Sequence, residues 1–284
     1  MLTTFTYAKG HEDGFDWFYP PWLLVGVARH RHVQLQDGPG LHLHSTNSAI
    51  ATARFTPESD SDADERVVSI TGHGRGIAHI EARHGHHIKA TLHVSVYPHR
   101  VVKVNFFRVK DKSGQVPIFN SSMVHKLTNQ INHLHRHQTN LSFESHLVHN
   151  EVPIDLDFST PDQSASAIQH IWDVLKKKTE KLDNSPSHYH VFWVKTWGAK
   201  DKTCNGKKVR DVIGTASEIG GHICVMEDMH DPHKQGLLLA HELGHCLKAH
   251  HDEVRESALM YPQLAGGRKI YRHAVVEVRG HLQH

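Results

Sequence analysis

Cysteine is scarce in this sequence. Only three cysteines occur among the 284 residues, at Cys204, Cys224 and Cys246. Three cysteines allow at most one internal disulfide, which excludes the class of small folds held together by several such bonds. A disulfide between Cys204 and Cys224 and a set of free buried thiols are both open alternatives. A chain of this length can bury a hydrophobic core without disulfides.

Long hydrophobic runs and an excess of one charge are also missing. The apolar stretch 17–28 contains two prolines and is too short to span a bilayer. The N-terminus lacks the basic and apolar regions of a signal peptide. Lys and Arg total 32 against 30 Asp and Glu, for a formal net charge of +2. We therefore predict neither a membrane span nor a nucleic-acid partner.

Histidine, in contrast, is abundant. The sequence contains 31 histidines, scattered from His11 to His284. A pair of histidines at a spacing of four residues therefore has little meaning by itself in this chain. A metal site must be supported by other residue types around the pair. A protein that buffers metal through its many histidines is one alternative, and it would bind many zinc ions weakly.

The first 99 residues read as short strands separated by Gly, Pro, Asp and Ser. Apolar and polar residues alternate within 67–98, which is the period of half-buried strands. Within that range, Gly74 to Ala82 and Ala90 to Val96 resemble the last strands of a bacterial immunoglobulin-like domain. The resemblance implies an all-β sandwich at 1–99 that spaces, anchors or binds a surface or protein partner.

Helices and strands alternate after residue 100. Apolar residues recur at helical spacing within 121–137, and a second helix is expected between Pro161 and Asn184. Strands are expected at 101–109, at 141–148 and within 188–197, and a loop followed by a strand at 212–226. The sequence thus predicts a second domain of the α+β class at 100–284.

The segment "QGLLLAHELGHCLKAH", residues 235–250, carries the chemistry. It has no proline, and its leucines recur at helical intervals. His241 and His245 would lie one turn apart on one face of this helix, where both can bind one metal ion. Glu242 is displaced by about 100°, which suits a base better than a metal ligand. This pattern is typical of zinc hydrolases.

A third ligand requires the chain to turn back after the helix. If the helix continued, His251 would lie about 9 Å beyond His245 along the helix axis. A turn near Leu247 would return the chain to the metal, and the spacing from His241 favours His251 as the ligand. His250 and Asp252 remain alternatives.

The sequence "SALMYP" follows at 257–262. Together with "HELGHCLKAHHD" it resembles the metzincin superfamily of zinc peptidases, nearest to the matrixins and adamalysins, over roughly residues 100–284. The resemblance implies Zn²⁺ bound by His241, His245 and His251, with Met260 in a tight turn beneath them. Lys248 departs from the family, which has glycine there; a lysine in the left-handed region costs roughly 1 to 2 kcal/mol.

The same resemblance implies residues that hold the substrate. The family has an edge strand before the metal helix that aligns an extended peptide by adding it to the sheet. Residues 218–226 occupy that place, and the segment after the methionine would form the wall of a side-chain pocket. The implied substrate-binding residues are Gly220, Gly221, His222, Ile223, Tyr261 and Pro262.

We therefore expect a zinc-dependent endopeptidase that hydrolyses peptide bonds of a protein or peptide through a metal-activated water, with Glu242 as general base. The alternative is a binding or adhesion protein with a degenerate metal domain, which Lys248 favours. The family resemblance implies an extracellular, secreted protein. Because no signal peptide is visible, a cytoplasmic location is the alternative.

Overall fold

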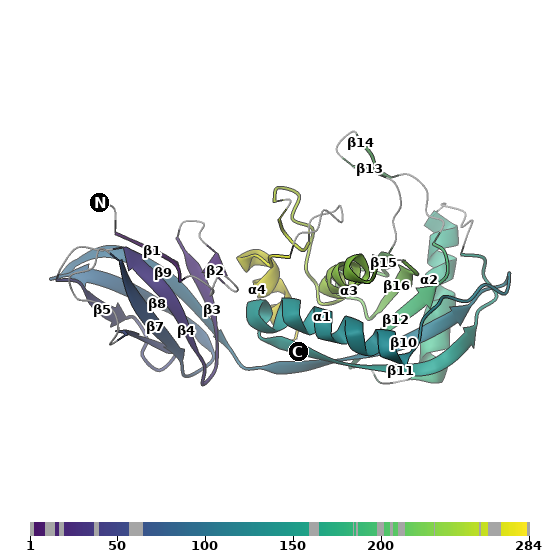
Figure 1. Ribbon diagram of the computed structural model, residues 1–284, viewed down its shortest axis with the longest axis horizontal. Coiled ribbons are helices and arrows are strands. Elements are labelled where there is room, and N and C mark those ends of the chain that lie inside the picture. Colours follow the sequence, from purple (N-terminus) through teal and green to yellow (C-terminus); the bar gives the residue numbers. More distant parts are fainter. Residues whose placement is uncertain are drawn as a thin grey trace. The chain divides into compact units, whose positions relative to one another are not determined.

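The computed structural model divides into two compact units (Figure 1). Unit 1 comprises Met1–Arg100, Arg136–Asn140 and Tyr271–His273, and unit 2 comprises the rest of the chain. No helix among the described residues is long and apolar enough to cross a membrane. The structure describes residues 3–8, 15–16, 20–36, 40–56, 65–158, 165–183, 185, 187–197, 202–204, 207–209, 214–229, 231–255, 257–260 and 268–282.

Unit 1 contains two sheets that share one hydrophobic core. One sheet has the strand order β1-β4-β7-β6 and the other β2-β3-β9-β8-β5. Strand alternation sends every second side chain inward, so that Val33, Ile70, Ile80 and Val94 meet in the core. The strands expected within 67–98 are present. The bounds are β1 Thr4–Tyr7, β2 Phe15–Asp16, β3 Trp22–Gly26, β4 His30–Gln36, β5 His42–Ser45, β6 Ala51–Phe55, β7 Glu65–Gly72, β8 Gly76–His84 and β9 His87–Tyr97.

Unit 2 combines helices with a five-stranded sheet of order β11-β10-β12-β16-β15. Strands β10, β12 and β16 are parallel, and β15 pairs antiparallel with β16. The mixture of helices and strands confirms that this part of the chain is not all-β. The bounds are β10 Arg100–Lys110, α1 Ser121–Thr139, β11 Leu141–Pro153, α2 Ala165–Leu182, β12 His188–Val194, β13 Lys202–Cys204, β14 Lys207–Val209, β15 Gly214–Ala216, β16 Ile223–Glu227, α3 Pro232–Cys246 and α4 Arg272–His281.

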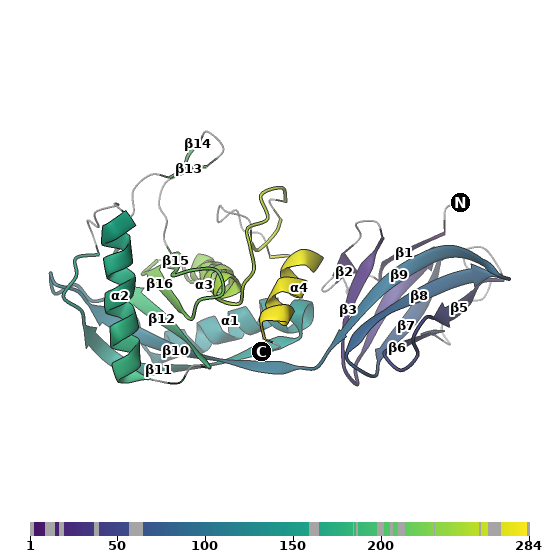
Figure 2. The same ribbon diagram turned by 180° about the vertical axis from the view of Figure 1, so that it is seen from behind.

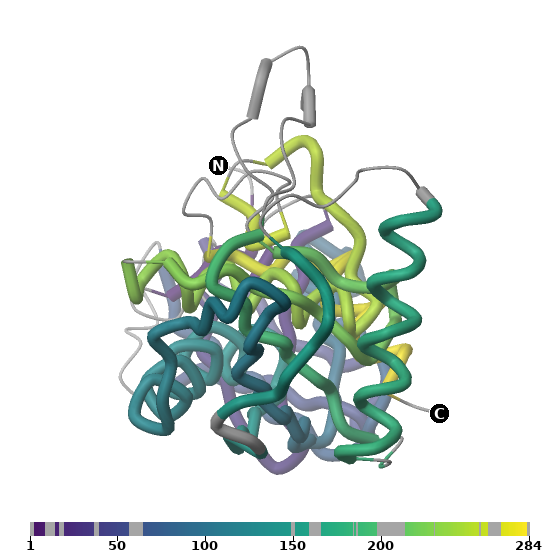
Figure 3. The backbone as a smooth tube through the Cα atoms, turned by 90° about the vertical axis from the view of Figure 1, so that its right-hand side faces the viewer, coloured from purple at the N-terminus to yellow at the C-terminus, as the bar shows by residue number. Residues whose placement is uncertain are grey.

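The helices cover both faces of the unit 2 sheet. Ile171 and Leu175 of α2 pack in one core cluster with sheet residues that include Phe107. Helices α1 and α3 lie on the opposite side, as Figures 2 and 3 show. Cys224 of β16 faces α3, where it interacts with Cys246. The metal motif therefore lies on the face of the sheet that α2 does not cover.

The position expected for the substrate-aligning strand is wrong. Residues 223–227 form β16, but β16 pairs with β12 on one side and with β15 on the other. Beyond β16, the strand at this edge of the described sheet is the three-residue β15, and β11 forms the other edge. Sequence pattern identifies a strand by its residues, whereas its place in the sheet depends on partners that are distant in the chain.

Candidate metal centre

Helix α3 begins and ends where its sequence dictates. Asp231 is the N-cap, and its carboxylate accepts hydrogen bonds from the backbone N–H groups of His233 and Lys234. Pro232 follows at the first helical position, where its missing N–H costs nothing. Every residue from 235 to 246 is buried, so packing from all sides fixes the orientation of the motif.

The chain turns back after the helix, as the sequence predicts. Lys248 has a φ of 77°, in the left-handed region. The backbone N–H of Ala249 donates to the carbonyl of Gly244 at 2.8 Å, and that of Lys248 donates to the carbonyl of His245 at 2.8 Å. These bonds satisfy carbonyls at the end of the helix and reverse the chain direction.

The turn brings three imidazoles together. The Nε2 atom of His245 lies 3.1 Å from Nε2 of His241 and 2.9 Å from Nε2 of His251, and the third separation is 3.3 Å. In the described part of the chain, these three residues form the one group of three or more His, Cys, Asp or Glu side chains whose ligand atoms all lie within 4.8 Å of one another, close enough to hold one metal ion. The three ligands that the spacing favours thus converge on one point.

Backbone carbonyls fix which nitrogen of two rings carries the proton. Nδ1 of His241 lies 2.8 Å from the carbonyl oxygen of Leu259, and Nδ1 of His245 lies 2.8 Å from that of Ala249. A carbonyl oxygen only accepts, so both Nδ1 atoms donate and both Nε2 atoms expose lone pairs. Burial lowers the pKa of His241 to about 3 and that of His245 to about 4, so both rings are neutral near pH 7.

Converging lone pairs repel one another unless a cation lies between them. Four nitrogens bound tetrahedrally to zinc at 2.0 to 2.1 Å would be roughly 3.3 Å apart, close to the separations of His241, His245 and His251. Hydrogen bonds from the outer ring nitrogens to backbone carbonyls are the usual support of metal-binding histidines. The residues therefore fit a metal ion bound through three imidazoles.

The other two candidate ligands are held elsewhere. Nδ1 of His250 lies 3.0 Å from Oε1 of Glu277, and the backbone N–H of His250 donates to the same carboxylate. The buried carboxylate of Asp252 accepts from the backbone N–H groups of Val254 and Arg255 and pairs with the Arg255 guanidinium. Neither side chain belongs to the histidine cluster.

Glu242 lies buried against the edge strand. Its side chain is 4% exposed, and its Oε2 atom has no hydrogen-bond partner. A Cβ placed on Gly214 of β15 would lie 3.2 Å from Oε1 of Glu242, so glycine permits this close contact. Burial raises the pKa of Glu242 to about 8, although a hydrogen bond from the Ala216 backbone opposes the shift. A carboxyl group with a pKa near neutrality can accept and return a proton.

Met260 lies against the metal helix. It is 2% exposed, and a Cβ on Gly244 would lie only 2.5 Å from its sulfur, so Gly244 makes room for the methionine. Its carbonyl accepts from the backbone N–H of Asp252 at 2.9 Å, which ties the methionine segment to the turn. The supporting role of Met260 remains a prediction. Tyr261 and Pro262 lie outside the described residues.

The segment 220–223 contacts the end of the helix. Gly220 has a φ of 85°, and its N–H donates to the carbonyl of His245 at 2.8 Å. The carbonyl of His222 accepts from His190, and that of Ile223 accepts from Ser217. These two carbonyls are engaged within the sheet, and a role of Gly220, Gly221, His222 and Ile223 in substrate binding remains a prediction.

The strain at Lys248 can be measured. Lys248→Gly is expected to increase the free energy of unfolding by about 1 kcal/mol, because relief of the left-handed strain exceeds the added entropy of the unfolded chain. Urea unfolding of both proteins checks this. Lys248→Ala keeps a Cβ at the same φ and should not stabilise. Equal stability of the glycine variant and the parent would show that the strain at Lys248 does not exceed the entropic cost of glycine.

The cysteines adopt the free-thiol alternative where they are described. Cys224 and Cys246 are buried free thiols. Their packing between β16 and α3 is that of small apolar side chains. The side chain of Cys204 lies outside the described residues, so its state stays a prediction.

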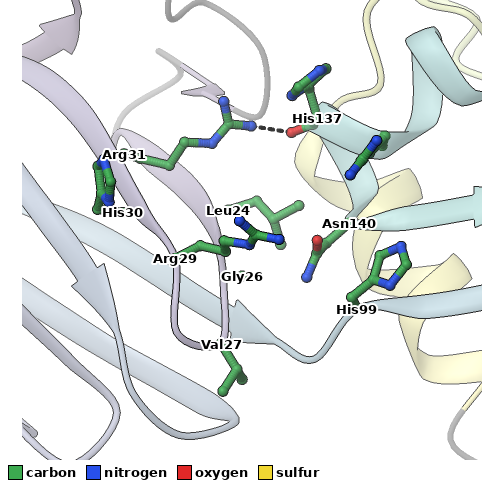
Figure 4. Close-up of a pocket in the computed structure, with 10 residues that line it drawn as sticks. Leu24, Gly26, Val27, Arg29, His30, Arg31, His99, His137 and Asn140 are labelled. Atoms are coloured by element: carbon green, nitrogen blue, oxygen red, sulfur yellow. Dashed lines mark hydrogen bonds between the residues drawn. The ribbon is translucent and has the colours of Figure 1, made fainter.

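Sequence reasoning also missed a basic cavity in unit 1. Its volume is about 320 Å³, and Arg29, Arg31 and Arg136 are among its lining residues. Figure 4 shows the Arg31 guanidinium directed at the backbone carbonyl of His137, to which it donates. The lining residues come from separate parts of the chain, and no local motif marks them.

Comparisons with known proteins add little to this geometry. No family model matches the chain, and no curated protein matches it. Metalloproteinase-II from Bacteroides fragilis is similar with a TM-score of 0.44 and 12% identity, covering 92% of this chain and 85% of that chain. The S-layer protein SbsC, domains 4 and 5, is similar with a TM-score of 0.23 and 16% identity, over 26% of this chain and 46% of that chain. Neither TM-score establishes a shared fold.

Proposed function

We propose that the chain is a zinc-dependent endopeptidase. The observation that carries the proposal is the convergence of three Nε2 atoms from His241, His245 and His251, two of them fixed as acceptors by backbone carbonyls. Neutral imidazoles in a set of three, with a fourth position open, are the ligands typical of catalytic zinc. When bound, zinc supplies Lewis-acid chemistry, polarising a carbonyl and lowering the pKa of a water to about 7.

Glu242 would move the proton. Its buried carboxyl follows His241 in the helix, and its Oε2 atom has no other partner. In the proposed reaction Glu242 accepts a proton from the attacking water and donates it to the leaving amine. Burial favours the protonated form of Glu242, which returns the proton, and a bound zinc cation would favour the carboxylate form, which accepts it.

The edge strand β15 would position the peptide. Gly214 lies directly over Glu242, and the Ala216 N–H interacts with the same carboxylate. An extended peptide that pairs with the outer side of β15 would therefore cross the sheet edge next to the base. We assign this alignment to β15 in place of residues 218–226.

We propose further that unit 1 is an immunoglobulin-like module that binds a surface or protein partner, and that the protein acts outside the cell. The shared core of two sheets supports the first statement. The second rests on the resemblance to secreted zinc peptidases. The alternative of a degenerate metal domain rested on Lys248, but the required turn forms with lysine in place.

Metal analysis combined with casein digestion tests the enzyme. We expect one tightly bound zinc per chain, cleavage of casein, loss of cleavage on chelation and recovery with added zinc. A binding protein with a degenerate site would show neither stoichiometric zinc nor proteolysis. A metal-buffering protein would bind many ions weakly, which titration calorimetry with zinc distinguishes.

A further inference from the structure

Unit 2 contains a cavity of about 610 Å³, here named the α2 cavity. Three segments line it: the face of α2 with two residues that follow the helix, the start of β12, and residues 217–223, which comprise the loop between β15 and β16 and the first residue of β16. Its volume falls in the range of small-ligand sites, about 300 to 1,000 Å³. The cavity is thus large enough for a long side chain and part of the backbone that carries it.

The loop that lines the α2 cavity also contacts the end of α3, the helix on the other face of the sheet that carries two of the candidate ligands. Loop 217–223 follows directly after Ala216, whose N–H interacts with Glu242. The N–H of Gly220 in this loop donates to the carbonyl of the ligand residue His245. A peptide aligned on β15 would therefore reach the loop, and one of its side chains could enter the cavity.

Negative charge predominates in the lining. Asp173, Glu180, Asp183 and Glu218 are opposed by one lysine, Lys176. In the part of the chain that the structure describes, no side-chain hydrogen bond or ion pair engages the carboxylates of Glu180 and Glu218. The cavity therefore presents two uncompensated carboxylates, one on the helix wall and one on the loop wall.

The Asp183 carboxylate is already engaged by hydrogen bonds from its neighbours. Its Oδ2 atom lies 2.8 Å from Nδ1 of His188 and 3.1 Å from Nε2 of His190. Burial alone would raise the pKa of Asp183, but hydrogen bonds from His188, from the Ser185 N–H and from His190 lower it to about 2. The Oδ2 atom of Asp183 is therefore already occupied by hydrogen bonds, whereas the carboxylates of Glu180 and Glu218 are available to a ligand.

A single metal ion does not fit this arrangement. Among the described residues, three potential ligand atoms come within 4.8 Å of one another only in the histidine cluster of α3. An extended organic cation can reach separated carboxylates, and Trp172 in the same lining offers an indole on which a planar guanidinium stacks.

We propose that the α2 cavity binds an arginine side chain of the polypeptide substrate. The guanidinium stacks on Trp172 and pairs with Glu180 and Glu218, while the substrate backbone lies along β15. The inference rests on the proposed peptidase function, because it names a feature of the substrate. It predicts a preference for arginine at one position outside the two residues that flank the scissile bond.

Binding of labelled peptides tests the cavity without requiring cleavage. Two series of fluorescein-labelled dodecapeptides are compared. In the first, a single arginine is placed at each position in turn, and in the second, neutral citrulline replaces that arginine. Their affinity for the zinc-loaded Glu242→Gln protein is measured by fluorescence polarisation. We expect one arginine position to bind about tenfold more tightly than its citrulline counterpart. Equal affinity of the two series at every position overturns the proposal.

Two carboxylate substitutions locate the interaction. Glu180→Gln combined with Glu218→Gln changes two exposed side chains and should abolish the arginine preference. Glu144→Gln removes another exposed carboxylate of unit 2, outside the cavity, and should leave the preference intact. An arginine preference that survives the double substitution contradicts the assignment to this cavity.

Digestion of the same peptides by the unsubstituted protein separates the two proposals. Arginine-dependent binding without chelator-sensitive cleavage contradicts the peptidase function and leaves the cavity assignment standing. Chelator-sensitive cleavage that treats arginine and citrulline peptides alike contradicts the cavity assignment and leaves the peptidase standing. Cleavage at a fixed distance from the arginine, lost with citrulline, supports both.

Discussion

Glu242→Gln is expected to reduce cleavage of casein by at least about 100-fold while zinc remains bound. General base catalysis contributes this much or more, and glutamine preserves the volume of the side chain but cannot accept the proton. His241 and His245 keep their hydrogen bonds to backbone carbonyls, so the candidate metal site should be unaffected. The measurements are the initial rate of digestion and zinc content after dialysis.

The matched control is Glu253→Gln. Glu253 is an exposed carboxylate in the turn that follows the third histidine. Its substitution removes the same charge near the site and should leave the rate unchanged. A Glu242→Gln protein that binds zinc and digests casein at the parent rate would exclude Glu242 as the base.

The local features of the metal site could be predicted from the sequence. His241 and His245 are one helical turn apart, and the helix period alone places them on one face. The need for a turn follows from the same geometry, because a continuing helix would carry His251 too far. The preference for His251 rested on its spacing from His241, and His250 and Asp252 stayed open until the structure was known. Lys248 in the left-handed region shows that such a requirement can override the preference of the residue.

Features that depend on distant strand pairing could not be predicted. Glu242 contacts Gly214 because β15 pairs antiparallel with β16 and its Gly214 lies against α3. Three residues are too few for a strand pattern, so the edge strand that the family resemblance implies was assigned to the strand nearest the metal helix, within 218–226. The true edge could be identified only when both neighbours of β16 were known.

The α2 cavity has the same origin. Glu180 and Glu218 are separated by 38 positions in the sequence, and neither belongs to a motif. The charged face of α2, which includes Lys176 to Lys178, has the sequence pattern of an ordinary solvated helix surface. Only the approach of loop 217–223 to this face turns part of it into an acidic cavity.

His251→Ala is expected to weaken zinc binding by at least about 100-fold and to abolish cleavage with it. Loss of an outer-sphere partner alone costs a metal site 10- to 100-fold in affinity, and loss of a ligand should cost no less. His250→Ala is the matched control, because this neighbouring histidine pairs with Glu277 instead of joining the cluster. Competition with a fluorescent zinc indicator measures both variants. Loss of zinc on substitution of His250, with His251→Ala binding normally, would reverse the assignment and show that the turn presents the other imidazole to the metal.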